Sequence, residues 1–105
     1  MQKLKQSTAF TTIVGPILDS DGVEYSGAVI GDLSITKNGT TAAMAAAATL
    51  TYISNGYYTL VGTTGNSDTV GRADVTCNKS TYQMPPKCFE VLPATVFDAL
   101  VTNAT

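Results

Sequence analysis

The sequence has 105 residues, the length of one domain, and only 13% of them are charged. The net charge is −2 and the six basic residues are scattered, which excludes the clustered basic surface that nucleic acid requires. No apolar run approaches the roughly 18–20 residues that span a bilayer, and none follows residues 1–7 as in a signal peptide. We therefore expect a chain made in a reducing cytoplasm, with no membrane contact.

Short β-prone runs separated by turn residues fill the first half of the chain. Residues 9–14 predict a strand, and Gly15-Pro16 interrupts it as at an edge strand that switches sheets. Residues 19–22, Asp-Ser-Asp-Gly, predict a turn, because Asp caps turn amides and Gly accepts positive φ. Residues 33–37 alternate cleanly, and Asn38-Gly39 predicts a type I′ hairpin turn into a returning strand.

The second half continues in the same pattern. Residues 42–48 are rich in Ala but short, and we interpret them as a strand or loop of small residues. Strands are predicted at residues 49–53, 57–61, 72–77 and 88–92. Pro93 suits the first turn of a short C-terminal helix over residues 93–101. Alternation directs the following side chains to one face of each strand: Phe10, Thr12, Val14, Leu33, Ile35, Tyr58, Leu60, Ala73, Val75, Cys77, Phe89 and Val91.

This pattern predicts one all-β domain over residues 1–105. About seven short antiparallel strands at this spacing are typical of a sandwich or a barrel. Residues 1–8 would form an N-terminal arm, and the helix over residues 93–101 would close the chain.

The residues that most often carry catalysis are missing. The chain has no His, so neither a Ser–His–Asp nor a Cys–His arrangement can be built. Asp19 and Asp21 fall in a turn, Asp74 and Glu90 fall on outward strand positions, and residues 19–22 lack the rest of a calcium loop. Cys77 and Cys88 match no zinc signature; two free thiols are favoured, with a disulfide as the alternative. We expect no enzyme activity, no metal and no cofactor.

The five tyrosines are the main candidates for contacts with other proteins. Tyr52, Tyr57 and Tyr58 cluster around the Asn55-Gly56 turn, whereas Tyr25 and Tyr82 stand alone in the sequence. One member of the pair Tyr57/Tyr58 must face outward in a regular strand. Tyr57 is therefore either an interface anchor or an ordinary aromatic residue on the sheet surface.

Several segments in this order resemble a domain of virion proteins of tailed bacteriophages and prophages. The segments are residues 15–20 (Gly-Pro-Ile-Leu-Asp-Ser), 26–28, 33–39, 55–60 (Asn-Gly-Tyr-Tyr-Thr-Leu), 69–72 and 89–100, and they cover nearly the whole chain. The order of the segments is also similar to that of an immunoglobulin-like (Ig-like) sandwich in which the Asn-Gly-Tyr-Tyr segment enters a central strand. Carboxypeptidase-regulatory-like domains have a similar arrangement. The resemblance implies a single Ig-like β-sandwich without catalysis.

The resemblance also implies a virion structural role. Relatives often continue into fibre or linker sequence beyond the segment equivalent to residues 98–100, whereas this chain stops at Thr105, which favours a head decoration or cement protein. Its partners would be the major capsid protein or other virion proteins, with many copies or a homo-oligomer on each particle. The alternative is a tail, baseplate or fibre module that binds a receptor or a host-surface glycan; a small hydrolase is a distant third. The residues expected at the interface are Lys3, Lys5, Tyr25, Tyr57, Tyr82 and Phe97.

Overall fold

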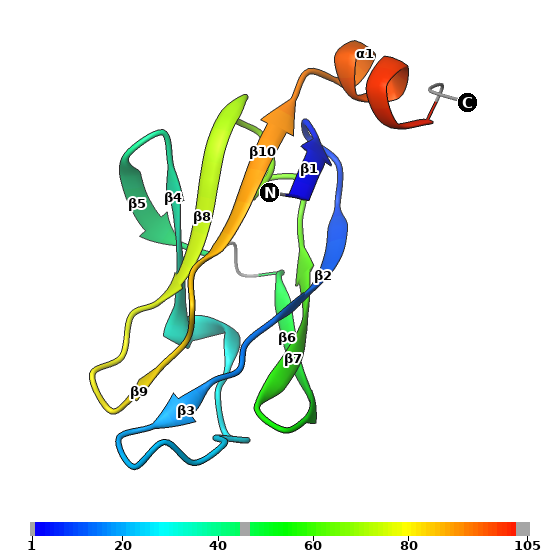
Figure 1. Ribbon diagram of the computed structural model, residues 1–105. Coiled ribbons are helices and arrows are strands. Elements are labelled where there is room, and N and C mark those ends of the chain that lie inside the picture. The colour runs from blue at the N-terminus through cyan, green and yellow to red at the C-terminus, as the bar shows by residue number, and fades with distance from the viewer. Residues whose placement is uncertain (1, 45–46, 103–105) are drawn as a thin grey trace.

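The computed structural model describes residues 2–44 and 47–102, with the side chains of the last two of these left out. The larger of its sheets has five strands (Figure 1). In spatial order they are β1 (Gln2–Lys5), β10 (Lys87–Leu92), β8 (Gly71–Cys77), β4 (Leu33–Lys37) and β5 (Thr40–Ala43). All neighbours in this sheet are antiparallel except β1, which pairs in parallel with β10.

A smaller sheet packs against it. Its three antiparallel strands are, in spatial order, β2 (Phe10–Val14), β7 (Tyr57–Gly62) and β6 (Thr49–Ser54). A separate two-stranded sheet, β3 (Leu18–Asp19) with β9 (Tyr82–Gln83), lies at one end of the sandwich (Figure 1). The helical elements are the 3-10 turn η1 (Ile30–Asp32), the short helix α1 (Ala94–Phe97) and the π-helical turn η2 (Asp98–Thr102).

The strand order is that of an Ig-like sandwich. In that fold, strands B, E and D share one sheet, while C, F and G share the other. Here β2, β7 and β6 take the places of B, E and D, and β4, β8 and β10 take those of C, F and G, with β5 extending the second sheet. The all-β, Ig-like fold with a short C-terminal helix is thereby confirmed.

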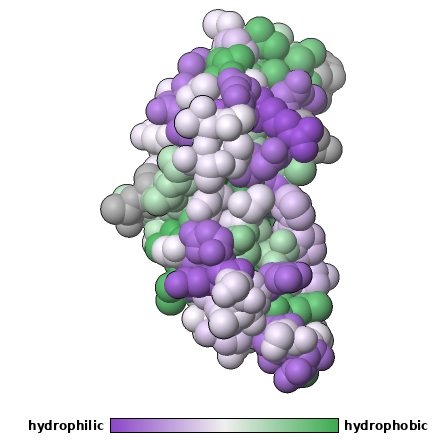
Figure 2. Space-filling view, turned by 90° about the vertical axis from the view of Figure 1, so that its left-hand side faces the viewer, coloured by the Kyte–Doolittle hydropathy of each residue, from purple (hydrophilic) through white to green (hydrophobic). Residues whose placement is uncertain are grey.

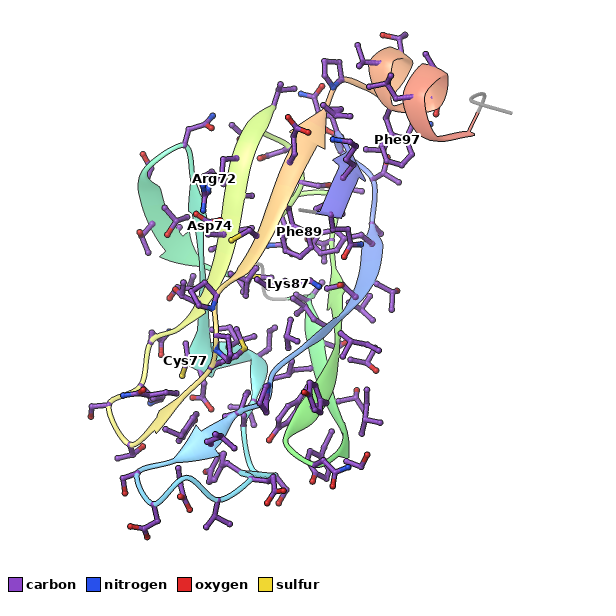
Figure 3. The ribbon with its side chains drawn as sticks, in the orientation of Figure 1. Arg72, Asp74, Cys77, Lys87, Phe89 and Phe97 are labelled. Carbon is purple, nitrogen blue, oxygen red and sulfur yellow. The ribbon has the colours of Figure 1, made fainter. Side chains whose placement is uncertain are left out.

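The core lies between the two sheets and follows the predicted alternation. Leu33, Ile35, Val75 and Val91 are at most 2% exposed on the inner face of the large sheet. On the inner face of the small sheet, Val14, Tyr58 and Leu60 are buried, together with Thr12. The rings of Phe10 and Phe89 join the sheets, with centroids 5.4 Å apart, and Figure 3 shows Phe89 directed into this space. Cys77 is only half-buried, at the edge of this core.

Two Asn-Gly pairs form the tight turns that the sequence predicts. Asn38 and Gly39, between β4 and β5, have φ of 49° and 92°, and Asn55 and Gly56, between β6 and β7, have φ of 55° and 84°. Positive φ at both central positions is the geometry of a type I′ turn, whose twist matches that of the flanking strands. The Asn38 side chain also bonds the Val70 carbonyl and the Arg72 amide, and so ties this hairpin to β8.

Two segments differ from the expectation. Residues 2–5, expected within a free N-terminal arm, form strand β1, so the sheet gains a parallel pair that the all-antiparallel prediction lacked. Leu4 is buried between the sheets, which explains why this polar segment docks. Of the Ala-rich residues 42–48, the first two belong to β5, and residues 45 and 46 lie outside the described ranges.

Candidate functional site

The described ranges hold no cluster suited to a metal. No three His, Cys, Asp or Glu side chains among them come together closely enough to bind an ion. Within the same residues, no helix is long and apolar enough to cross a bilayer. Three surfaces of the structure have features that could contact a partner.

The first surface is the end of the sandwich where long loops meet, which we call the loop end. Residues 15–32 connect β2 to β4, residues 78–86 connect β8 to β10, and the two segments pair through β3 and β9 (Figure 1). The Asn55-Gly56 turn joins them, because the Ile17 amide donates to the Gly56 carbonyl at 2.8 Å. These segments take the places of the B–C and F–G loops, which form part of the binding end of immunoglobulin variable domains.

Tyrosine side chains fix the loop end to the core. The Tyr58 hydroxyl donates to the Tyr25 carbonyl oxygen and accepts from the Ala28 amide at 3.2 Å. The ring of Tyr25 stacks on that of Tyr82, with centroids 4.3 Å apart and planes 20° from parallel. The Tyr82 hydroxyl in turn donates to Asp32. The longest connection, residues 15–32, is therefore held at several points rather than hanging free.

Asp32 is the buried charge of this network. It is 7% exposed; its Oδ2 accepts from the Val29 amide at 3.0 Å, and its Oδ1 lies 3.7 Å from the Lys79 ammonium. Burial alone would raise the pKa of Asp32, but the hydrogen bonds from Tyr82 and Val29 and the charge of Lys79 outweigh it and lower this pKa. Burial and the bond to Asp32 raise the pKa of the Tyr82 hydroxyl, which therefore stays a donor.

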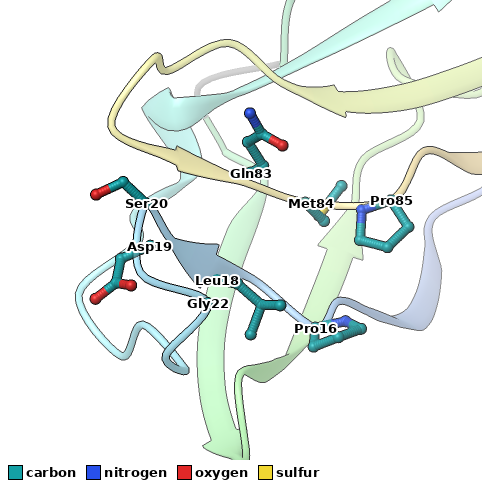
Figure 4. Close-up of a pocket in the computed structure, with 8 residues that line it drawn as sticks. All are labelled: Pro16, Leu18, Asp19, Ser20, Gly22, Gln83, Met84 and Pro85. Atoms are coloured by element: carbon teal, nitrogen blue, oxygen red, sulfur yellow. The ribbon is translucent and has the colours of Figure 1, made fainter.

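A groove of about 500 Å³ opens between the two loops of this end (Figure 4). It is lined by Pro16, Leu18, Asp19, Ser20, Gly22, Gln83, Met84 and Pro85. The Asp19 carboxylate oxygen Oδ1 accepts from the amides of Asp21 at 2.9 Å and Val23 at 3.0 Å. This is the turn chemistry predicted for residues 19–22, and it fixes the Asp19 carboxylate in the turn beside the groove.

The charges of the molecule are distributed unevenly. Five ion pairs engage five of the six basic side chains: Lys3–Glu90, Lys5–Asp98, Lys37–Asp68, Arg72–Asp74 and Lys79–Asp32. All eight acidic residues lie in the described ranges, and the three outside these pairs are Asp19, Asp21 and Glu24. Lys87 is the basic residue outside them. Asp19, Asp21 and Glu24 therefore contribute −3 on the loop beside the groove, and Lys87 contributes the +1 that brings the net charge to −2.

The second surface is the outer face of the small sheet. Strands β2, β6 and β7 contain no charged residue. The face exposes Ile13 (56%), Val61 (37%) and Tyr57 (42%) among threonines, with Ile53 beside a register shift in β6. β6 is also an edge strand of six residues without Pro or charge, the features that usually protect such edges.

The third surface is the opposite end, where α1 and η2 cover β1. Val96 is 41% exposed and Leu100 is 56% exposed. Figure 2, which views the molecule from the side of the β4–β5 hairpin, shows hydrophobic residues gathered at this upper end. Phe97 points back from the helix, as Figure 3 shows, and lines a cleft of about 230 Å³ with residues of β1 and β2.

The six residues predicted at an interface fall into two groups at opposite ends. Lys3, Lys5 and Phe97 lie at the helical end, where both lysines are already in ion pairs. Tyr25, Tyr57 and Tyr82 lie toward the loop end, but only Tyr57 is well exposed. Tyr82 is 7% exposed beneath Tyr25, so the two tyrosines that stand alone in the sequence form one stacked pair and not a surface platform.

Sequence reasoning did not find the groove. Its apolar lining comes from Pro16 and Leu18 and, 66 to 69 positions later, Met84 and Pro85, and the β3–β9 pairing brings the two segments together. The one available signal was the occurrence of prolines beside two short strands, which marks edges and interruptions. Cys77 and Cys88 are both free, on neighbouring strands of one sheet.

Comparisons with known proteins add little to this geometry. A scan against protein-family models and a search of curated proteins found no match. Among solved structures, the chain is similar to the twitchin kinase region from C. elegans (Fn31-NL-kin-CRD-Ig26), with 11% sequence identity and a TM-score of 0.43. The match covers 88% of this chain and 14% of that structure. The assignment of the fold rests on the strand order itself.

Proposed function

We propose that this chain is a non-enzymatic structural protein of a phage virion, a decoration or cement protein that binds the major capsid protein. It would sit on the head in many copies and reinforce contacts between capsid subunits. The observation that carries the docking role is the uncharged outer face of the β2–β7–β6 sheet, and the virion setting rests on the resemblance of residues 15–20, 33–39, 55–60 and 89–100.

The composition of this face favours permanent burial over exposure to water. Interface cores are depleted in charged residues and enriched in aromatic ones. Ile13, Tyr57 and Val61 offer apolar contact area, and the threonines between them can bond to a partner without the cost of burying a charge. On the outer face of the large sheet, by contrast, Lys3 pairs with Glu90 and Arg72 pairs with Asp74.

The size of the face explains why many copies would be needed. Three strands about 4.8 Å apart, each about six residues long at about 3.3 Å per residue, span an area of about 300 Å². A standard stable interface buries about 800 Å² on each partner. One copy would therefore bind weakly through this face alone, and stable attachment requires neighbouring surfaces such as the β6 edge or several linked copies.

Quantitative mass spectrometry of particles from the phage or prophage that encodes the chain tests the assignment. Decoration predicts a copy number comparable to that of the major capsid protein. Absence from the particle would reject the virion role. A copy number of only a few would favour the alternative, a tail, baseplate or fibre module that binds a receptor or glycan.

A further inference from the structure

We propose that the loop-end groove binds an extended peptide segment of a partner protein, in which an apolar side chain is flanked by Lys or Arg. This inference goes beyond the docking face and does not depend on the virion assignment. It rests on the shape and lining of the groove and on the charge beside it.

The lining defines the apolar part of the ligand. Pro16, Leu18, Met84 and Pro85 line the groove from both loops, as Figure 4 shows. Its volume of about 500 Å³ lies within the roughly 300–1,000 Å³ typical of ligand sites. Two prolines and a pinned two-stranded sheet make the lining rigid, so an entering side chain would find a preformed site.

The negative charge beside the groove defines the residues that flank the apolar side chain of the ligand. Asp19 lines the groove, while Asp21 and Glu24 lie on the exposed loop that follows. Backbone bonds from the Asp19 amide to the Val23 carbonyl and from the Gly22 amide to the Asp19 carbonyl close this loop tightly. Asp19, Asp21 and Glu24 thus place three carboxylates within six residues of one loop at the rim of the groove, and the ion pairs found among the described residues engage none of the three. Such a rim attracts cations and repels nucleic acid and anionic membranes.

The position in the fold favours a polypeptide over a small molecule. The groove is formed by loops at the end of a rigid sandwich, where Ig-like domains commonly present their binding residues. Asp19 uses Oδ1 for its own turn, and within the described residues Oδ2 has no hydrogen-bond partner. This oxygen can accept from a Lys ammonium or an Arg guanidinium.

A nuclear magnetic resonance titration tests the inference directly. The probe is the blocked pentapeptide Gly-Lys-Leu-Lys-Gly, added to the isotope-labelled chain. We expect saturable amide shifts at Leu18, Ser20, Gly22, Gln83 and Met84, with a Kd in the range of about 0.1–2 mM, because so small a ligand buries little area. The peptides Gly-Glu-Leu-Glu-Gly and Gly-Lys-Ser-Lys-Gly should shift these amides at least about fivefold less at equal concentration.

Matched variants separate charge from folding. Asp21→Asn should weaken binding about two- to threefold at low salt, whereas Glu90→Gln, which removes a partly exposed acid on the large sheet, away from the groove, should leave the Kd unchanged. Pro85→Ser should weaken binding of the Leu peptide while the amide spectrum elsewhere stays native. The proposal is overturned if the Glu peptide binds as tightly as the Lys peptide, if no shifts occur up to about 5 mM, or if the shifts map outside the two loops.

Discussion

The outer faces of the two sheets of this sandwich differ in their charged residues. The outer face of the five-stranded sheet carries Lys3, Glu90, Arg72 and Asp74, and each of these is in an ion pair. The three-stranded sheet has no charged residue on either face and exposes Ile13 and Tyr57 instead. Both sheets bury a similar apolar inner face, so the difference is not needed for folding.

Under the proposed function, the charged face of the large sheet stays in contact with water and the uncharged face of the small sheet docks on a partner. Surface ion pairs add little stability, but charged side chains keep a face soluble and discourage unwanted contacts. A face without charged side chains lacks this protection, and its edge strand β6 also has no Pro or charged residue to discourage pairing with another strand.

The largest effect is expected where the sheets meet. Phe89→Ala removes a fully buried ring from the large sheet and its contact with Phe10 of the small sheet. The cavity and the lost burial should lower the free energy of unfolding by about 3–5 kcal/mol. Urea denaturation followed by circular dichroism measures this loss, with Thr76→Ala on the outer face of β8 as the control. A loss below about 1 kcal/mol would show that this contact does not join the sheets.

A smaller effect is expected at the buried carboxylate of the loop end. Asp32→Asn replaces the charge-assisted acceptor of Tyr82 and Val29, which should cost about 1–3 kcal/mol. Because the folded pKa of Asp32 is lowered, its contribution to stability is fully present above its unfolded value of 3.8 and is lost as the pH falls through the lower folded pKa. Denaturation between pH 7 and pH 2 should therefore show a steeper loss in the wild type than in Asp32→Asn; parallel curves would contradict this.

The smallest effect concerns the ion pairs that distinguish the large sheet. Lys3 and Glu90 form a 2.6 Å pair, but both side chains are more than two-fifths exposed. Lys3→Ala should change the free energy of unfolding by less than about 0.5 kcal/mol. A larger loss in thermal unfolding would show that this charged face contributes to folding, and the contrast between the sheets would then need another explanation.

The sequence predicted local features well and long-range ones poorly. Alternation placed Tyr58 inward and Tyr57 outward, and Asn38-Gly39 formed its turn, because both depend only on neighbouring residues. Strand β1 was missed because two lysines among four residues give no strand signal, and its parallel pairing joins residues at opposite ends of the chain. The stacking of Tyr25 on Tyr82 and the groove depend on the same kind of non-local contact.

The most direct test of docking through the small sheet measures how much purified protein binds to phage heads that lack it. Two variants, each with one Glu substitution, are compared. Val61→Glu places a charge on the outer face of the small sheet, and Thr76→Glu places one on the outer face of the large sheet. Both variants should fold, as checked by thermal unfolding. We predict that Val61→Glu lowers occupancy on the heads at least tenfold and that Thr76→Glu leaves it unchanged. Equal occupancy for both variants, or a loss confined to Thr76→Glu, would contradict the account.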